Sequence, residues 1–219
     1  MGSHSLPTPR IVLASGSPRR RTLLAQLNVP FTVMVSGIDE TADSRPVPED
    51  LVRHLARRKA AAVAAQTSSD FVIGCDTIVV IDGLVLGKPA DALTARRMLR
   101  RLSGRDHDVY TGVAIVACGR LHVVTSALRT IVTMRALQDQ EITDYVNTGE
   151  PFDKAGGYAA QGVGASLIDH IQGCSANVVG LPLCELITLF GILGYGLPWA
   201  VCSGINGKRC PRLTDRAAS

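Results

Sequence analysis

Apolar residues in this chain gather in short runs separated by turn residues, and longer segments with helical spacing lie between the runs. Short apolar or alternating runs bounded by Gly, Pro, Asn or Asp predict buried strands. The predicted strands cover residues 11–14, 31–36, 71–75, 78–81, 84–86, 109–118, 121–134 and 166–171. Asp82-Gly83 is a typical hairpin turn, so we expect 84–86 to pair back on 78–81.

Apolar residues three and four positions apart predict helices with one buried face. The predicted helices cover residues 18–27, 48–65, 91–102, 138–147 and 182–194. Helices alternate with strands early in the chain, whereas long hairpins occupy its middle. This order predicts an α/β fold with a mixed, twisted sheet rather than a purely parallel one.

Composition limits the classes of function. With 219 residues, 46% of them apolar, the chain can bury a full core, and one domain with two lobes fits this length. The net charge of +4 suits an anionic substrate, but 4% aromatic residues leave little material for stacking bases. A nucleic-acid binder would be favoured by the arginines of one predicted helix, which are Arg96, Arg97, Arg100 and Arg101. We expect them on its solvated face, and hence no nucleic-acid partner.

The cysteines indicate a reducing compartment. No pair among Cys75, Cys118, Cys174, Cys184, Cys202 and Cys210 has CxxC spacing, and several lie in apolar runs. Buried free thiols are therefore expected, rather than disulfides or a zinc site. The first apolar run is short and is followed by arginines, unlike a signal peptide. These features predict a cytoplasmic protein.

The domain is expected to span residues 10–200. We interpret residues 1–9 as a tag or a disordered N-terminus, and residues 201–219 as a polar, disordered tail. The apolar stretch 186–201 is interrupted by glycines and Pro198. It predicts a core helix rather than a membrane span, so no membrane partner is expected.

The segment Ile11–Arg21, IVLASGSPRRR, combines a strand, a turn of small residues and a helix start. Ser17 is a good N-cap and Pro18 a good first helical residue. Free N–H groups and the helix dipole favour an anion there, and Arg19 and Arg20 add cations suited to phosphate. The alternative is a surface helix that happens to begin with arginines.

Two acidic residues follow predicted strands, Asp76 after 71–75 and Glu40 after 31–36. Ligands in open α/β sheets bind beyond the carboxyl ends of strands, and two carboxylates can hold a divalent metal. Each can equally be a turn or cap residue. Three of the chain's few lysines, Lys59, Lys88 and Lys154, lie near loop breaks or on the helix after the acidic pair, where a compact charge suits phosphate.

His107 precedes a predicted strand within Asp106-His107-Asp108. It could serve as a metal ligand, or lie at the surface or behind the site. His54 and His122 are isolated, and we interpret both as structural.

Several motifs together resemble the Maf family of nucleotide pyrophosphatases in order and spacing. These are Ser15-Gly16-Ser17-Pro18-Arg19-Arg20, Gly74-Cys75-Asp76-Thr77, Gly87-Lys88-Pro89, Leu102-Ser103-Gly104, His107 with Thr111-Gly112, Asp153-Lys154-Ala155-Gly156, Gln161-Gly162 and Val179-Gly180-Leu181-Pro182. The resemblance covers about residues 10–194. Position 75 departs from the family's usual Ala, a small change beside Asp76.

The resemblance implies the fold of the inosine triphosphate pyrophosphatases, with a mixed sheet in two lobes around a central substrate cleft. It implies a house-cleaning hydrolase that converts a nucleoside triphosphate to monophosphate and pyrophosphate with a divalent metal (Mg, Mn or Co). Arg19, Thr77 and Gln161 fall on positions linked to substrate choice, and this combination resembles the dTTP/UTP-cleaving branch. Modified pyrimidine nucleotides, a homodimer and a role in cell-division arrest are left open.

Each candidate residue then has an expected role. The family's proposed general base falls on Asp76, which we expect to act in catalysis with Lys59 and Lys88, and Glu40 and Asp76 are the candidate metal ligands. The expected substrate-binding residues are Ser15, Ser17, Arg19, Arg20, Thr77, Lys154 and Gln161. The alternative is a nucleotide-binding regulator of septum formation without catalysis, which would keep the cations but would not need Asp76 or Glu40.

Overall fold

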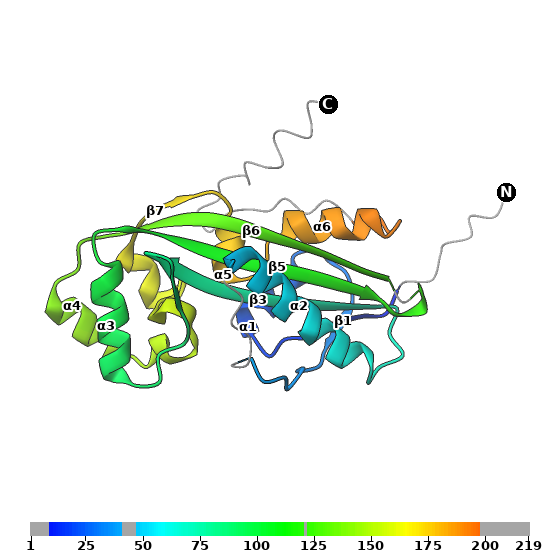
Figure 1. Cartoon of the computed structure of the whole chain (residues 1–219), viewed down its shortest axis with the longest axis horizontal. Coiled ribbons are helices and arrows are strands. Elements are labelled where there is room, and N and C mark those ends of the chain that lie inside the picture. The colour runs from blue at the N-terminus through cyan, green and yellow to red at the C-terminus, as the bar shows by residue number, and fades with distance from the viewer. Residues whose placement is uncertain (1–8, 41–46, 121, 198–219) are drawn as a thin grey trace, which may run out of the picture.

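One mixed sheet runs the length of the molecule (Figure 1). The computed structural model describes residues 9–40, 47–120 and 122–197, and seven strands in these residues form the sheet. The strands are β1 (Ile11–Leu13), β2 (Phe31–Val33), β3 (Phe71–Ile81), β4 (Leu84–Leu86), β5 (Asp106–Ala117), β6 (His122–Met134) and β7 (Ile168–Gln172). They lie in the order β2-β1-β3-β5-β6-β7, with β4 paired to β3.

The sheet mixes two kinds of pairing. β1 is parallel to β2 and to β3, whereas β3–β4, β3–β5, β5–β6 and β6–β7 are antiparallel. The β3–β4 turn contains Asp82 and Gly83, both with positive φ, as a tight hairpin requires. The predicted α/β fold with a mixed sheet is therefore confirmed.

The helices are α1 (Pro18–Ala25), α2 (Pro48–Ala64), α3 (Ala92–Leu102), α4 (Asp139–Asn147), α5 (Ser175–Val179) and α6 (Leu183–Ile192). Helices α1 to α4 begin where the sequence offers helix-start signals. Proline occupies the first turn of α1 and α2. The Asp91 side chain accepts a hydrogen bond from the Thr94 N–H at 2.7 Å and so caps α3. Gln138 and Glu141 form a capping box at the start of α4.

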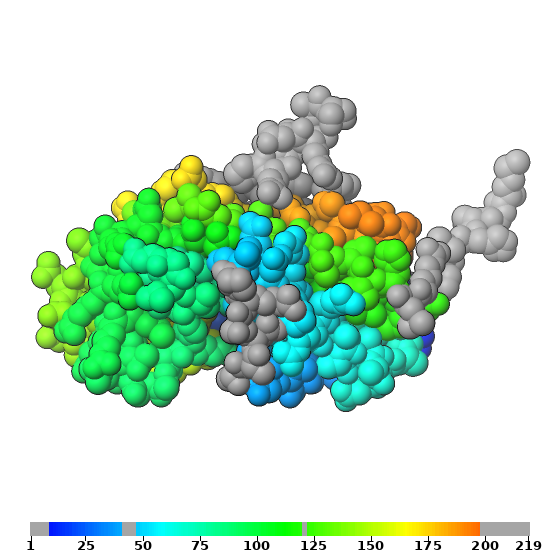
Figure 2. Space-filling view, viewed as in Figure 1, coloured from blue at the N-terminus to red at the C-terminus, as the bar shows by residue number. Residues whose placement is uncertain are grey.

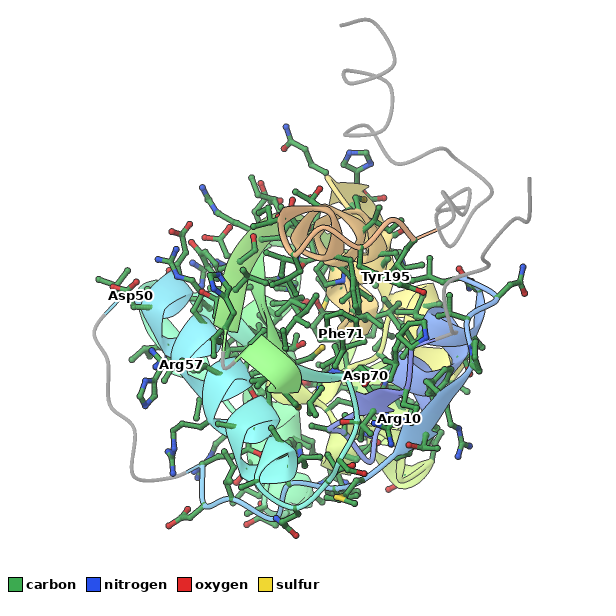
Figure 3. The ribbon with its side chains drawn as sticks, turned by 90° about the vertical axis from the view of Figure 1, so that its right-hand side faces the viewer. Arg10, Asp50, Arg57, Asp70, Phe71 and Tyr195 are labelled. Carbon is green, nitrogen blue, oxygen red and sulfur yellow. The ribbon has the colours of Figure 1, made fainter. Side chains whose placement is uncertain are left out.

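Alternate residues of the central strands pack on opposite faces of the sheet. Val12, Ala14 and Val72 lie in a hydrophobic cluster with Ala56, Ala60 and Val63 of α2. Ile11, Leu13 and Ile73 lie in a second cluster with residues of α1, α5 and α6. Figure 3 shows α2, labelled at Asp50 and Arg57, on the other side of the sheet from α6. The period of two thus decides which helix each strand residue contacts.

An aromatic group closes the end of the sheet near the N-terminus. Phe71 meets Phe190 with ring centroids 5.2 Å apart and Tyr195 with centroids 5.5 Å apart. The adjacent ion pair between Arg10 and Asp70 is exposed, with its N and O atoms 3.3 Å apart (Figure 3). Most of the stabilisation at this end therefore comes from the rings.

Two glycines allow α2 to approach the sheet closely. A Cβ on Gly74 of β3 would lie 2.1 Å from the Ala56 carbonyl oxygen, and one on Gly112 of β5 would lie 2.1 Å from the Val52 carbonyl oxygen. Both obstacles are helix backbone, which cannot turn aside as a flexible side chain can. The absence of side chains at these two positions therefore sets the position of α2.

The sheet extends through two lobes. The lobe with β1, α1, α2 and α6 is described above, and a separate hydrophobic cluster fills the other lobe between α3, α4 and the distal ends of β3, β5 and β6. In Figure 2, α3 (green) lies in the left part of the surface and α2 (cyan) at its centre. The long strands β3, β5 and β6 are common to both lobes (Figure 1). The predicted two-lobed arrangement is confirmed.

Several predicted boundaries were wrong. The strands expected at 71–75 and 78–81 are one continuous strand, β3, so Asp76 lies in the middle of a strand and not after its end. The chain stays extended because residues on both sides of Asp76 are buried on both faces of the sheet. β2 stops at Val33, so Glu40 lies in a loop several residues beyond the strand.

Other segments form a different type of secondary structure from the one predicted. A short helix, α5, precedes α6, although no helix was predicted between residues 171 and 182. The predicted strand 166–171 begins later, as β7 at Ile168, because Gly162–Leu167 forms a 3₁₀ helix. The predicted tag or disordered segment 1–9 and the predicted tail 201–219 lie wholly or mostly outside the described residues.

The predictions about the apolar stretch 186–201 and about the cysteines can be compared with the structure. In the described part of the chain, no helix is long and apolar enough to cross a membrane, and the predicted C-terminal core helix is α6. Of the cysteines within that part, Cys75, Cys174 and Cys184 are buried as expected, and Cys118 is half-buried. Burial raises the pKa of the Cys75 thiol to about 11.

We expect Gly112→Ala to destabilise the fold. The added methyl would overlap the backbone of α2, and overpacking of this kind costs about 3 kcal/mol. At this chain length that loss lowers the melting temperature by about 6–12 °C. Gly191→Ala is the matched control, because nothing lies within 4 Å of a Cβ at this exposed position in α6. Alanine there should leave the melting temperature unchanged or raise it. Equal effects of the two substitutions would contradict the proposed contact.

Candidate active site

A gap in the pairing of β3 opens the sheet at one edge. β1 pairs with β3 only as far as Ile73, and β4 begins to pair at Val79. Between these points the edge has no partner strand within the described residues. A cavity of about 880 Å³ lies here, lined by Asp76 and Thr77 of β3 and by residues of both lobes. The central cleft expected between the lobes is thus present.

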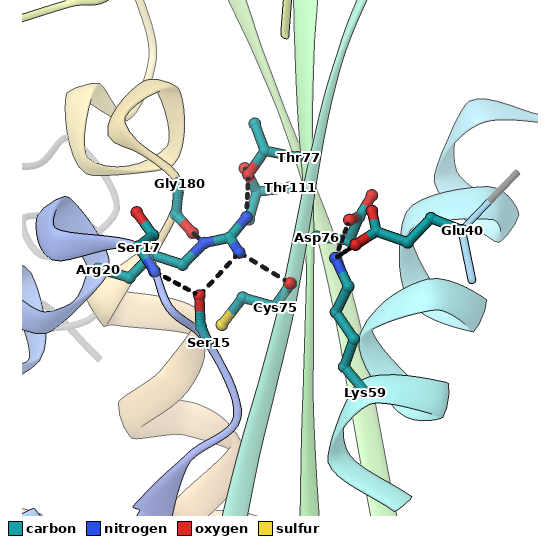
Figure 4. A network of polar contacts seen from close by, with 10 residues as sticks. All are labelled: Ser15, Ser17, Arg20, Glu40, Lys59, Cys75, Asp76, Thr77, Thr111 and Gly180. Atoms are coloured by element: carbon teal, nitrogen blue, oxygen red, sulfur yellow. Dashed lines mark hydrogen bonds and ion pairs between the residues drawn. The ribbon is translucent and has the colours of Figure 1, made fainter. Parts of the chain in front are cut away.

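β3 directs Asp76 and Thr77 to opposite faces of the sheet (Figure 4). Even-numbered residues of the strand, such as Ile78 and Val80, pack toward α2, and odd-numbered residues such as Ile73 pack toward α1 and α6. Asp76 therefore lies on the α2 side, whereas Thr77 faces the start of α1. The cavity reaches both faces because the open strand edge separates them.

On the α2 side, Lys59 joins the two acidic candidates. Its Nζ lies 2.6 Å from Asp76 Oδ1 and 3.0 Å from Glu40 Oε1. Lys59 and Asp76 are buried, at 7% and 5% exposure, whereas the Glu40 side chain is 47% exposed. The structure thus brings Glu40, Lys59 and Asp76 together, with an ammonium between two carboxylates (Figure 4).

On the opposite face, Arg20 is held by the protein itself. It donates from Nε to the Gly180 carbonyl at 2.8 Å, from Nη1 to the Cys75 carbonyl at 3.0 Å, and from Nη2 to Thr77 Oγ1 at 2.9 Å (Figure 4). The Cys75 carbonyl belongs to the unpaired edge of β3, so Arg20 replaces the missing strand there. Arg20 lines the cavity, yet these bonds make it a structural link between α1, β3 and α5.

The hydroxyl groups behind Arg20 form an ordered chain. Thr111 donates to the Asn177 carbonyl at 2.9 Å, and its oxygen lies 2.9 Å from Thr77 Oγ1. Since Thr111 has a single hydroxyl proton, Thr77 must donate to Thr111 and accept from Arg20. This direction leaves Thr77 a fixed hydroxyl beside the cavity.

The two predicted serines lie in the turn before α1. Ser15 is buried, and its Oγ accepts from the Ser17 N–H and from Arg20 Nη1, each at 3.3 Å. Ser17 is the N-cap residue of α1 as expected, but its side chain makes no capping hydrogen bond. Both serines line the cavity together with Arg19.

A second charged group comes from the other lobe. Lys154 is 9% exposed, contacts the Asp153 carboxylate and donates to the Glu150 carbonyl at 3.2 Å. Arg19 Nη1 lies 3.7 Å from Asp153 Oδ2, so Asp153 stands between a cation of each lobe. Partial burial alone would raise the pKa of Asp153, but Lys154 and Arg19 hold it below its ordinary value. Desolvation lowers the pKa of Arg19.

The remaining two predicted residues are exposed, and only Lys88 lines the cavity. Lys88 follows β4, is exposed and lines the cavity, and it makes no ion pair with any described residue. Gln161 is exposed and does not belong to the cavity lining, although its neighbour Ala160 does. Of the predicted site residues, Gln161 alone is not brought into the cavity among the described residues.

The sequence did not predict the contact that anchors the segment around Tyr158. Tyr158 lines the cavity, and its hydroxyl lies 2.6 Å from Nε2 of His107, which is buried in β5. Burial lowers the pKa of His107 to about 4, so the ring is neutral near pH 7. His107 is thus behind the cavity wall rather than at the surface, and its spacing from Tyr158 gave no signal of the contact.

The acidic pair fits a divalent cation only in part. Glu40 and Asp76 supply oxygen ligands, and Mg²⁺ is typically held by one or two carboxylates together with substrate phosphates. No group of three or more His, Cys, Asp or Glu residues in the described ranges could hold a metal. A metal bound here therefore needs oxygens from a ligand.

Comparisons with known proteins agree with this geometry. The family model described as Maf-like protein matches residues 10–192. The chain is 51% identical over 189 residues to the dTTP/UTP pyrophosphatase of Myxococcus xanthus, covering 86% of this chain and 95% of that protein. It is 49% identical over 187 residues to the dTTP/UTP pyrophosphatase of Pelotomaculum thermopropionicum, covering 85% of this chain and 98% of that protein.

A third relative, the dTTP/UTP pyrophosphatase of Moorella thermoacetica, is 50% identical over 190 residues, which cover 85% of this chain and 98% of that protein. The matched region contains both lobes and every candidate residue of the cavity. Identity at this level over nearly the full length of each relative leaves one assignment: the chain belongs to the Maf family.

Proposed function

We propose that this chain hydrolyses dTTP and UTP to the monophosphate and pyrophosphate. The observation that carries the proposal is one cavity with an acidic half, Glu40 and Asp76 around Lys59, and a cationic half that includes Arg19 and Lys154. A triphosphate needs cations along its phosphates and a carboxylate near the attacking water. The relatives named dTTP/UTP pyrophosphatase supply the substrate class.

Charge stabilisation is the main task of the protein groups in this mechanism. Water attacks a phosphorus of the α–β anhydride, a new P–O bond forms, and the bond to the pyrophosphate leaving group breaks. Lys88, Lys154 and Arg19 neutralise charge that builds up on the phosphate oxygens. Arg20 contributes indirectly, because its bonds to β3 hold the start of α1 in place.

Asp76 orients the attacking water and accepts its proton, or shares a metal with Glu40. Lys59 supplies this buried carboxylate with a cationic partner at 2.6 Å. A divalent cation held by Glu40, Asp76 and phosphate oxygens would supply Lewis-acid stabilisation of the developing charge. The chain's own contribution is the fixed pair of carboxylates on the α2 side of the cavity.

The alternative, a nucleotide-binding regulator without catalysis, does not account for Asp76. Burying a carboxylate costs free energy even when it is paired, and nucleotide binding alone gains nothing from an acid beside phosphates. The test of the proposed function is direct. Pyrophosphate release from dTTP, UTP, ATP and GTP is measured with Mg²⁺, Mn²⁺ or Co²⁺. Release from none of them would refute the proposal.

We expect Asp76→Asn to keep the fold and to lower kcat by at least about 100-fold, because the amide neither accepts a proton nor supplies a full anionic ligand. Asp139→Asn is the matched control. It removes a carboxylate that is 75% exposed and paired with Arg100 outside the cavity. Melting temperature and pyrophosphate release are measured for both. Near-normal turnover of folded Asp76→Asn would remove Asp76 from the catalytic set.

We expect Asp153→Asn to lower KM for UTP by about two- to tenfold. Asp153 neutralises Arg19 and Lys154 in the free protein, and an incoming phosphate must compete with its carboxylate. The exposed Asp144 lies outside the cavity, and Asp144→Asn serves as the control for net charge. A raised KM in Asp153→Asn alone would show that Asp153 holds the two cations in their binding positions instead.

Gln161 is proposed to read the base. Its amide offers one donor group and one acceptor group, as the edge of uracil or thymine does, and it follows Ala160, which lines the cavity. We expect Gln161→Glu to lower the ratio of kcat/KM for UTP to that for GTP, because a carboxylate favours a base that presents donors. An equal loss on both substrates would indicate that Gln161 only supports its loop.

A further inference from the structure

We propose that Lys59 acts as a resident cation that keeps free metal ions out of the acidic half of the cavity. In this view a metal enters with the nucleotide, when a phosphate can take over the ammonium. The inference rests on the proposed function, since it assumes a metal–nucleotide complex as the ligand. It concerns the order of binding and the role of Lys59 rather than the chemical step.

The first support is the position of the Lys59 ammonium. Its Nζ contacts Asp76 Oδ1 at 2.6 Å and Glu40 Oε1 at 3.0 Å, so it fills the point at which both carboxylates converge. A divalent cation that uses both groups needs the same point. Ammonium and metal therefore compete for one location.

The second support is the burial of Lys59. The residue is 7% exposed, and its helix is fixed against the sheet because Ala56 and Ala60 lie close to Gly74. A metal that displaced the ammonium from Asp76 and Glu40 would leave a buried charge without its carboxylate partners. An unpaired buried charge is strongly destabilising. A bare metal ion brings no anion to offset that cost.

A nucleotide removes the obstacle. Its phosphates provide an anionic partner for the Lys59 ammonium and additional oxygen ligands for the metal. The cavity lining is continuous from Lys59 and Asp76 to Arg19 and Lys154, so one triphosphate can contact both halves. Metal and nucleotide should therefore bind cooperatively, each raising the affinity of the other by the same factor.

The test measures Mn²⁺ binding to the nucleotide-free protein, with free Mn²⁺ followed by electron paramagnetic resonance. We expect weak binding by the wild-type protein. Lys59→Met removes the ammonium but keeps a side chain of similar length, and it should bind Mn²⁺ at least about tenfold more tightly. The gain should disappear in Lys59→Met/Asp76→Asn. Lys88→Met is the matched control, because it removes the same charge from the same cavity without contacting either carboxylate.

An unchanged Mn²⁺ affinity in folded Lys59→Met would overturn the proposal, as would an equal gain in Lys88→Met. A measurement on the wild-type protein covers the case in which Lys59→Met does not fold. A UTP analogue with a nitrogen bridge between the α and β phosphorus atoms should raise the Mn²⁺ affinity at least about tenfold. Equal affinities with and without the analogue would refute the proposal.

The proposed function and the proposed role of Lys59 can be refuted independently of each other. Mn²⁺ binding by the nucleotide-free variants uses no substrate, so it tests Lys59 whether or not UTP is hydrolysed. Failure to release pyrophosphate from any triphosphate, with the Mn²⁺ results as expected, would refute the proposed function and leave the role of Lys59 intact. Normal UTP hydrolysis with equal Mn²⁺ affinity in wild-type and Lys59→Met would do the reverse.

Discussion

The close contact between α2 and two glycines is the constraint on which the site depends. Gly74 and Gly112 leave room for helix backbone directly against β3 and β5, where any side chain would overlap a carbonyl oxygen. That approach places Lys59 within 2.6 Å of Asp76. A helix held farther out by larger residues would leave Asp76 buried without its cation. The free energy of a buried carboxylate depends on such a partner, so packing and electrostatics are one requirement here.

The second constraint is the unpaired stretch of β3. Strand edges are normally paired or covered, because free N–H and C=O groups cost free energy. Here the pairing of β3 with β1 ends at Ile73, its pairing with β4 begins at Val79, and Arg20 donates a hydrogen bond to the Cys75 carbonyl between these points. The same guanidinium also binds Thr77 and Gly180. The Arg20 side chain thus supplies a hydrogen bond that a partner strand would otherwise make, and the cavity stays open beside it.

The sequence predicted the elements better than their junctions. Strand and helix periods follow from local burial, so the mixed sheet and all long helices were predicted, whereas the length of β3 was not. Asp76 and Thr77 look like a strand end because polar residues usually mark one. They lie within a strand because β1 and β4 leave an opening beside them, which depends on pairing between distant segments.

In the candidate site, likewise, individual residues could be predicted from the sequence, but the contacts between them could not. The strand–turn–helix motif near Ser15 and the acids Glu40 and Asp76 could be selected from residue type and position. The contact of Lys59 with both acids could not, since it depends on how α2 lies on the sheet. Asp153 was overlooked as a functional residue although it adjoins Lys154 in a quoted motif. Gln161 came from the family resemblance alone, and its exposed position next to Ala160 of the cavity lining is consistent with a contact to only one end of a ligand.

The charges of the cavity are arranged so that each half contains its own counter-ion. An ammonium lies between two carboxylates on the α2 side, and Asp153 lies between Arg19 and Lys154 on the other. This arrangement stabilises the free protein, because neither half contains a set of like charges without an opposite partner. It also weakens binding of simple ions, since each must displace an internal partner. A complex of metal and triphosphate carries both signs of charge, so it can replace both internal partners at once. On the proposed function, the ion pairs that allow these charged groups to be buried therefore also favour the metal–triphosphate complex over a simple ion as the ligand.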